Sequence, residues 1–374
     1  MPRWLYAMLV FGPLAVAGRV VGAPDLLVFS AAGLGLVPLA GLIGHATGQV
    51  ALHLGPQYGG LLNATFGNAA ELIITLFALR QGLTTLVKAS ITGSIVGNTL
   101  LVLGVALLAG GVRHGLLKFS VRPASLNAAL MILAVAGLVL PALFSTLVPD
   151  SGRVEAMSVM VAIILLASYF AYLAYVLRGD GPFVGPQRRR HHGRTVASAA
   201  APLPGAEVAS AEKRESPAVW SVRRGLLVLA AATLGTAVVS EALVNAVEPV
   251  TRQLGWTELF VGVILIPIVG NAAENWAAVR AAWHNHVDLT LGITAGSSTQ
   301  IPLFVTPVLI LASLVIGQPM TLVFEPLELT VLALSTAVFA YLSLDGESHW
   351  LEGVLLLALY LMTAVVFFLD PLTG

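Results

Sequence analysis

Long apolar stretches separated by short polar breaks run along almost the whole chain. A helix needs about 20 predominantly apolar residues to cross the hydrocarbon core of a bilayer. The pattern therefore predicts an all-α integral membrane protein with about eleven transmembrane helices; tallies of ten or twelve stay open, because the 26–79 region and the tail are crowded. The predicted spans run roughly over 4–22, 26–46, 58–79, 85–112, 123–147, 154–178, 221–247, 256–282, 288–316, 322–343 and 350–370.

Composition supports this class. Of 374 residues, 57% are hydrophobic and only 10% are charged, whereas a soluble domain carries about 25% charged residues. The net charge of zero argues against a nucleic-acid partner. No cysteine is present, so neither a disulfide nor a thiolate metal site is expected. The first stretch resembles a signal peptide, but it is long and carries Arg19, and we interpret it as a retained helix.

Polar breaks also define a linker and an orientation. Residues 179–220 replace the apolar pattern with Gly, Pro, Ser and charge, which is typical of a polar linker. With the N-terminus in the cytoplasm, 14 of the 19 Lys and Arg residues fall in cytoplasmic segments, including those of the linker. Positive charge in cytoplasmic loops sets membrane orientation, so we expect the N-terminus and linker inside and the C-terminus outside. The short chain without a long targeting tail favours a prokaryotic plasma membrane.

One five-residue word occurs twice. Gly67–Glu71 reads GNAAE, and Gly270–Glu274 repeats it 203 residues later. The same offset superposes Gly93-Ser94 on Gly296-Ser297. Each glutamate lies in an apolar stretch, where a carboxylate is costly and indicates function by default. A duplicated carboxylate in a duplicated membrane segment is typical of transporters built from internal repeats.

The span count gives the relation between the repeats. The first word falls in the third predicted span and the second in the eighth, so the two copies cross the membrane in opposite directions. This predicts an extra N-terminal helix over 1–25, a five-helix repeat over 26–178, the cytoplasmic linker over 179–220, and an inverted five-helix repeat over 221–374.

The words also suggest the chemistry. Gly and Asn are poor helix formers, and Pro267 precedes the second word, so we expect each word to weaken its helix inside the membrane. Freed carbonyls, amides and a carboxylate together make an all-oxygen site, which suits a hard divalent cation such as Ca²⁺. The predicted cation-binding residues come from both words and from the polar positions of the following spans: Glu71, Glu274, Asn68, Asn271, Gly67, Gly270, Ser94, Ser297, Gln300 and Asn98.

Buried carboxylates couple metal to protons. In a low dielectric a carboxyl group favours its protonated form when no cation is near and its ionised form when a cation is bound. A pair of such groups binds either metal or protons, which is the minimal chemistry of a cation/proton antiporter. No covalent step is needed, so we expect no enzymatic activity and no cofactor beyond the transported Ca²⁺ and H⁺.

At these residues the chain resembles the calcium/proton exchangers of the calcium/cation antiporter superfamily. Gly59–Ile74 closely follows that family's first repeat motif; the second word, Asp288-Leu289 and Gly296–Ile301 follow the second motif. The resemblance implies Ca²⁺ bound between the two glutamates and exchanged for protons, with the second and seventh spans as the moving helices. Asn275 departs from the pattern, because many relatives have His there, and a proton role of that His is absent or moved in this chain.

Other functions stay open at this point. Sodium-coupled exchange or exchange of another divalent cation would use the same fold, although the two motif regions contain no further acidic residue. A passive cation channel is less favoured, because two buried carboxylates favour occupancy over fast passage. The spans contain no His-Glu pair or nucleophile word that would indicate an intramembrane enzyme, and no phosphate-binding Gly-x-x-x-x-Gly-Lys motif that would indicate nucleotide use. The partners predicted are Ca²⁺, protons and lipid, and the sequence does not determine an oligomeric state.

Overall fold

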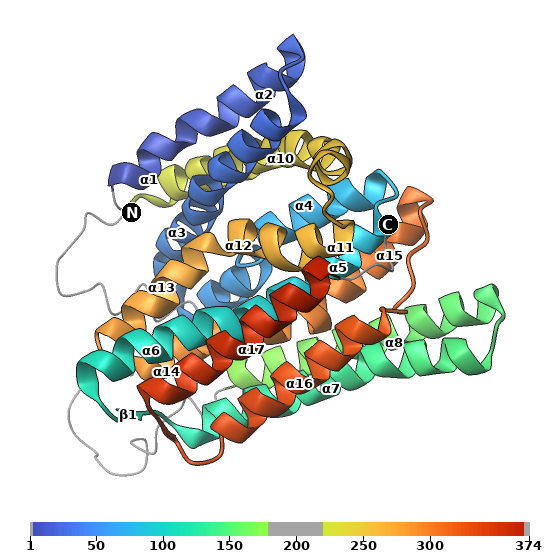
Figure 1. Ribbon diagram of the computed structural model, residues 1–374. Coiled ribbons are helices and arrows are strands. Elements are labelled where there is room, and N and C mark those ends of the chain that lie inside the picture. The colour runs from blue at the N-terminus through green and yellow to red at the C-terminus, as the bar shows by residue number, and fades with distance from the viewer. Residues whose placement is uncertain (1–2, 179–219, 370–374) are drawn as a thin grey trace.

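The computed structural model describes residues 3–178 and 220–369, and this part of the chain is almost entirely helical (Figure 1). The predicted linker lies outside the described residues, except for Trp220. Two short strands, β1 (Leu117–Lys118) and β2 (Glu347–Ser348), pair antiparallel. The helical elements are α1 (Arg3–Ala7), η1 (Met8–Val10), α2 (Phe11–Val21), α3 (Asp25–Phe66), α4 (Ala69–Arg80), α5 (Thr84–Val96), η2 (Gly97–Val102), α6 (Leu103–His114), α7 (Val121–Leu147), α8 (Ser151–Leu177), α10 (Val222–Leu254), α11 (Glu258–Phe260), η5 (Val261–Leu265), α12 (Ile266–Gly270), α13 (Ala272–Trp283), α14 (Val287–Gln300), η6 (Ile301–Val305), α15 (Thr306–Ile316), α16 (Pro326–Leu342) and α17 (Trp350–Leu369).

Within the described residues, seven helical segments are long and apolar enough to cross a membrane, and the bent pair Glu258–Gly270 and Ala272–Trp283 makes an eighth if it is counted as one span. The protein is therefore a multi-pass membrane protein. Two shorter apolar helices, Leu5–Val21 and Pro326–Leu342, fall on the first and tenth predicted stretches. The count of eleven spans and the inverted arrangement of the repeats stay predictions.

Helix α3 is longer than the sequence pattern suggested. The predicted spans over 26–46 and 58–79 leave a polar break between them, but α3 continues through His45 and Gln49 without a break to Phe66. Those polar residues contact the start of the second half instead. The His45 ring lies edge-on to Trp220 with 5.0 Å between ring centroids, and Gln49 Oε1 accepts a hydrogen bond of 3.0 Å from the Trp220 backbone N–H.

Both GNAAE words interrupt a helix, as their composition predicts. Helix α3 ends at Phe66 and α4 begins at Ala69; α12 ends at Gly270 and α13 begins at Ala272. The chain bends by 65° at the second break. Interrupted helices at membrane depth are tolerated where the freed backbone is buried in protein or lines a cavity, so the two breaks indicate a polar centre in the bundle.

Glycines allow the elements next to the two words to touch through their backbones. A Cβ built on Gly93 of α5 would lie 2.1 Å from the carbonyl oxygen of Val263 in η5. A Cβ on Gly262 would lie 2.4 Å from the Cβ of Ala89. Small residues permit such close packing of membrane helices. This contact fixes α5, which follows the first word, against the π-helical turn η5, which precedes the second.

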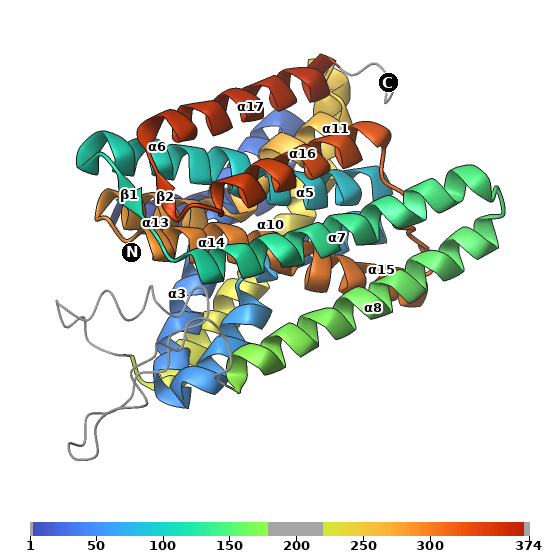
Figure 2. The same ribbon diagram turned by 90° about the horizontal axis from the view of Figure 1, so that it is seen from below.

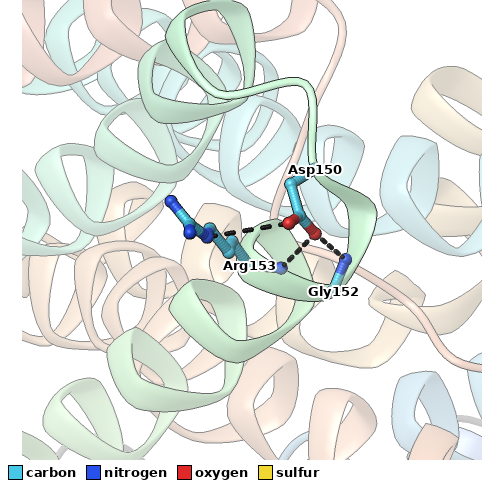
Figure 3. Close-up of polar contacts among 3 residues, drawn as sticks. All are labelled: Asp150, Gly152 and Arg153. Atoms are coloured by element: carbon cyan, nitrogen blue, oxygen red, sulfur yellow. Dashed lines mark hydrogen bonds and ion pairs between the residues drawn. The ribbon is translucent and has the colours of Figure 1, made fainter.

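The remaining helices surround this centre. Helices α3 and α10 pack along each other on one side, next to α2, while the α7–α8 hairpin and α16 lie on the opposite side (Figures 1 and 2). The hairpin reverses at Asp150, whose carboxylate caps α8 by accepting hydrogen bonds from the N–H groups of Gly152 (3.0 Å) and Arg153 (3.1 Å), as Figure 3 shows. The Arg153 guanidinium also approaches this carboxylate at 3.6 Å.

Candidate cation-binding site

The helix breaks place the two motif glutamates in the first turns of α4 and α13. Glu71 is deeply buried, with 3% of its surface exposed, whereas Glu274 is half-buried. Glu71 lies against the second word, because a Cβ on Gly270 would lie 3.1 Å from Glu71 Cγ, and ionised carboxylates at the two positions would repel each other. Two such negative groups in a membrane interior require protons or a cation.

Glu274 belongs to a hydrogen-bonded chain that crosses from one word to the other. The Ser297 hydroxyl on α14 contacts Glu274 Oε2 at 2.5 Å and Asn68 Oδ1 at 3.1 Å. Asn68 in turn donates from Nδ2 to Gln300 Oε1 at 2.7 Å. The amide of the first word is therefore bonded by a serine and a glutamine of the second half, and the serine links it to Glu274.

Glu71 has the reciprocal surroundings. Asn271 of the second word and Ser94 on α5 lie against its carboxyl group as hydrogen-bonding partners. All three side chains are almost fully buried. Each asparagine thus joins the Ser-Glu pair of the opposite half, so the two halves form one site. Within this site, Glu71 Oε1 has no hydrogen-bond partner among the described residues.

The glycines of the words differ in their surroundings. A Cβ on Gly270 would lie 3.1 Å from Glu71 Cγ, so this glycine leaves room for the carboxylate side chain. Gly67 lies at the break between α3 and α4 and is half-buried. Both glycines thus lie where the helices are broken, as the prediction requires.

Asn98 is buried, but it lies in a neighbouring recess. This recess lies between η2 and the α12–α13 break, and Asn98, Asn271 and Asn275 contribute to its lining together with Tyr360 of α17. Asn98 Nδ2 and Asn275 Oδ1 have no hydrogen-bond partner among the described residues. Asn271 therefore separates two polar regions, one containing Glu71 and the other containing Asn98.

Other polar residues of the second half lie outside the site. Asp288 accepts a hydrogen bond of 2.7 Å from the Ser120 N–H, which ties α14 to the start of α7. The ring of His284 bonds the carbonyl of Arg280, and the Glu241 side chain on α10 is exposed. The bond from Ser120 therefore gives Asp288 of the second motif a structural contact between α14 and α7.

Sequence reasoning missed one buried carboxylate. Glu328 in the first turn of α16 is only 1% exposed and accepts a 2.8 Å hydrogen bond from Thr92 of α5. The sequence Glu325-Pro326-Leu327-Glu328 matches a helix N-terminus with a capping box. Its position three residues after the N-cap Glu325, inside an apolar stretch, was the available signal.

The site has the composition expected for transient binding of a hard cation. Among the residues that the structure describes, no group of three or more His, Cys, Asp or Glu side chains could hold a metal ion. A cation at the words would instead combine two carboxylates with neutral amide, hydroxyl and carbonyl oxygens, which are ligands that Ca²⁺ accepts. Such a centre between broken helices of a multi-pass membrane protein is typical of membrane ion transporters.

The family follows from comparison with known proteins. The chain belongs to the sodium/calcium exchanger protein family, which it matches over residues 25–178 and 224–369. It is 42% identical over 369 residues to the Ca²⁺/H⁺ antiporter of Synechocystis sp., with 97% of this chain and 96% of the relative covered. It is 38% identical to the Ca²⁺/H⁺ antiporter ChaA of Bacillus subtilis, with 99% and 100% covered.

A solved structure agrees with these relatives. The crystal structure of the Ca²⁺/H⁺ antiporter protein YfkE superposes with a TM-score of 0.81 at 34% identity, covering 98% of this chain and all of that one. The resemblance to calcium/proton exchangers that the two motifs indicated is therefore confirmed.

Proposed function

We propose that this protein is a secondary antiporter that exchanges Ca²⁺ for H⁺ across its membrane. The observation that carries the proposal is the pair of motif glutamates, which meet in one buried, hydrogen-bonded centre built by both halves of the chain. Ca²⁺ binds with both carboxylates ionised, and protons replace it when the carboxylates are neutralised. The names of the relatives from Synechocystis sp. and Bacillus subtilis support this choice of ions.

The hydrogen-bond pattern supports both halves of the cycle. The hydroxyl of Ser297 has a single proton but contacts two oxygens, Asn68 Oδ1 and Glu274 Oε2. Since Asn68 already orients its amide by donating to Gln300, its oxygen can accept the serine proton. At this 2.5 Å contact a protonated Glu274 can donate to Ser297, and an ionised Glu274 can accept the serine proton in place of Asn68. The contact therefore serves both the proton-loaded and the Ca²⁺-loaded form.

Unequal access to the two halves supports alternating access. Residues 272–275, which are the end of the second word and the beginning of α13, are half-buried, whereas residues 68–71 of the first word are buried. Helix α13 leads towards Arg280, which the distribution of basic residues assigns to the cytoplasmic side. We propose that this arrangement opens the site to the cytoplasm, and that inverted repeats exchange roles in the outward-open form.

The moving parts follow from packing. Helices α3 and α10 pack mainly against each other and α2, at the side of the bundle, whereas α5 is locked to η5 through the Gly93 contact. We propose that α3 and α10 move as a pair across the site, while α5 and α14 with their serines stay fixed. This assigns gating to the second and seventh predicted spans, as the family resemblance implied.

Ion-gradient dependence of uptake tests the exchange reaction. Proteoliposomes that contain the purified protein should take up Ca²⁺ when their lumen is acidic. This uptake should stop when an uncoupler collapses the pH gradient. Sodium loaded inside in place of protons should drive no uptake. Uptake driven by the sodium gradient would retain the fold and the site but overturn proton coupling, and uptake without any gradient would indicate a channel.

A further inference from the structure

We propose that Glu328 is a positioning residue for exchange: through Thr92 it holds α5 so that Ser94 faces the carboxyl group of Glu71. The inference rests on the proposed function, because the reaction that Glu328 supports is Ca²⁺/H⁺ exchange. Glu328 lies outside both GNAAE words, on α16. It does not contact the two motif glutamates in any bond described above, and it reaches the centre only through Thr92.

The carboxylate of Glu328 is held at both oxygens. Oε1 accepts from Thr92 Oγ1 at 2.8 Å, and Oε2 accepts from the backbone N–H of Glu325 at 3.0 Å. Both Glu328 and Thr92 are almost completely buried, at 1% and 0% exposed. A buried carboxylate with both oxygens bonded has a defined orientation, and loss of either partner leaves a costly unpaired group.

A second bond reinforces this tie one helical turn earlier. Lys88, four residues before Thr92, donates from Nζ to the carbonyl of Val323 at 2.6 Å. Residues four apart lie on the same face of a helix. Lys88 therefore binds the backbone just before α16, and Thr92 binds a side chain in the first turn of α16. We name Lys88, Thr92, Val323 and Glu328 the α5–α16 clip.

Three consecutive residues of α5 connect the clip to the site. Thr92 bonds Glu328, Gly93 touches the Val263 backbone, and Ser94 lies against Glu71. Because the Gly93 contact leaves no space for even a methyl group, α5 has no freedom to slide towards η5. Rotation of α5 about its own axis remains possible at this contact, and the clip opposes that rotation. Rotation would carry Ser94 away from the carboxylate.

The other half of the chain lacks an equivalent clip. The offset of 203 that superposes the words maps Lys88 onto Leu291 and Thr92 onto Ala295, neither of which can form these bonds. It maps Val323 onto Ser120, whose N–H is bonded by Asp288 instead. The buried carboxylate of Glu328 therefore serves the first half alone, where the deeply buried Glu71 is the group to be positioned.

The test compares the Ca²⁺ concentration that half-saturates exchange among purified variants in proteoliposomes. Thr92→Val removes the hydroxyl at nearly constant volume and should raise this concentration about tenfold, the effect of a buried group left unsatisfied. Thr92→Ser should restore native behaviour. Thr85→Val makes the same change at an exposed position of α5 and should have no effect.

A double-variant cycle separates positioning from simple stabilisation. In a Ser94→Ala background, Thr92→Val should change half-saturation by less than about twofold, because the side chain that it positions is already absent. Equal effects in both backgrounds, or lower thermal stability with unchanged half-saturation, would overturn the proposal. Failure of the native protein to exchange Ca²⁺ for H⁺ would instead refute the proposed function.

Glu328→Gln tests the same positioning role if Thr92→Val does not fold. The glutamine oxygen can accept from Glu325 N–H while its amide donates to Thr92 Oγ1, so a positioning role predicts near-native exchange and half-saturation. Glu328→Ala should reproduce the defect of Thr92→Val. Loss of proton coupling in Glu328→Gln would contradict us, because it would mean that the carboxyl group itself carries protons.

Discussion

Gly93→Ala tests the packing that fixes the site. The added Cβ would be 2.1 Å from the Val263 carbonyl oxygen and 2.6 Å from its carbonyl carbon. Ordinary contact begins near 3.4 Å, so α5 and η5 must separate by about 1.3 Å, the difference between 3.4 and 2.1 Å. The opposing atoms are backbone, which cannot rotate away as a side chain can. We therefore expect a loss of stability at or above the upper end of the roughly 1–3 kcal/mol typical of overpacking.

The same displacement should affect binding, because Ser94 follows Gly93 directly. Separation of α5 from η5 by about an ångström removes hydrogen-bond geometry at Glu71, and we expect a weaker apparent Ca²⁺ affinity as well as a lower melting temperature. Both quantities can be measured on one detergent-purified preparation, by tryptophan-fluorescence melting and by uptake after reconstitution.

Gly97→Ala is the matched control four residues later. A Cβ there meets nothing within 4 Å, and alanine is favoured over glycine in a helix by roughly 0.5–1 kcal/mol. This variant should be as stable as the native protein or slightly more so. If Gly93→Ala melts at the same temperature as Gly97→Ala, the close contact between α5 and η5 is wrong, and so is the fixed position we assign to α5.

The remaining predictions concern the hydrogen bonds of the site, its protons and one helix cap. Ser297→Ala should raise the half-saturating Ca²⁺ concentration about tenfold by removing the link between Glu274 and Asn68. Ser298→Ala should have little effect, because that hydroxyl bonds two backbone carbonyls, Thr294 at 2.8 Å and Ile95 at 3.5 Å, and neither carboxylate. Equal defects of the two variants in transport assays would refute the link. Lowering the pH on the Ca²⁺-binding side should raise the half-saturating concentration with little change in maximal rate, since protons and Ca²⁺ compete for the same carboxylates; a fall in maximal rate alone would contradict competition. Asp150→Ala should cost about 1 kcal/mol of stability in thermal melting by removing the α8 cap, with unchanged Ca²⁺ half-saturation, and a transport defect would show that the hairpin does more than support the bundle.

The repeated GNAAE word predicted much of the candidate site from the sequence alone. Because Ser297 follows Glu274 at the same spacing as Ser94 follows Glu71, sequence alone predicted that both serines lie near their glutamates. The structure places both there. The sequence did not predict that the asparagine of each word bonds residues of the other half. These contacts depend on how the two repeats face each other. Whether these side chains bind the transported cation stays a prediction.

Features outside the words were harder to foresee. Helix α3 runs through its polar stretch because Trp220, 171 residues away from Gln49, provides partners for it. Glu328 reads locally as a helix cap, and only tertiary packing reveals that it also bonds Thr92, 236 residues earlier. We predicted Asn98 as a cation-binding residue because it lies in the same span as Ser94. In the structure it lies on the π-helical turn η2 and lines the recess next to Asn271.

The central claim is that Glu71 and Glu274 form one site that binds either Ca²⁺ or protons. The most direct measurement is Ca²⁺ uptake driven by an imposed pH gradient, in proteoliposomes or everted vesicles, for the native protein, Glu71→Gln, Glu274→Gln and Glu347→Gln. Glu347 is 46% exposed in a surface ion pair with Lys118 and serves as the control. We predict uptake by the native and control proteins and its loss in both motif variants. Gradient-driven uptake that persists in either motif variant would contradict the shared site.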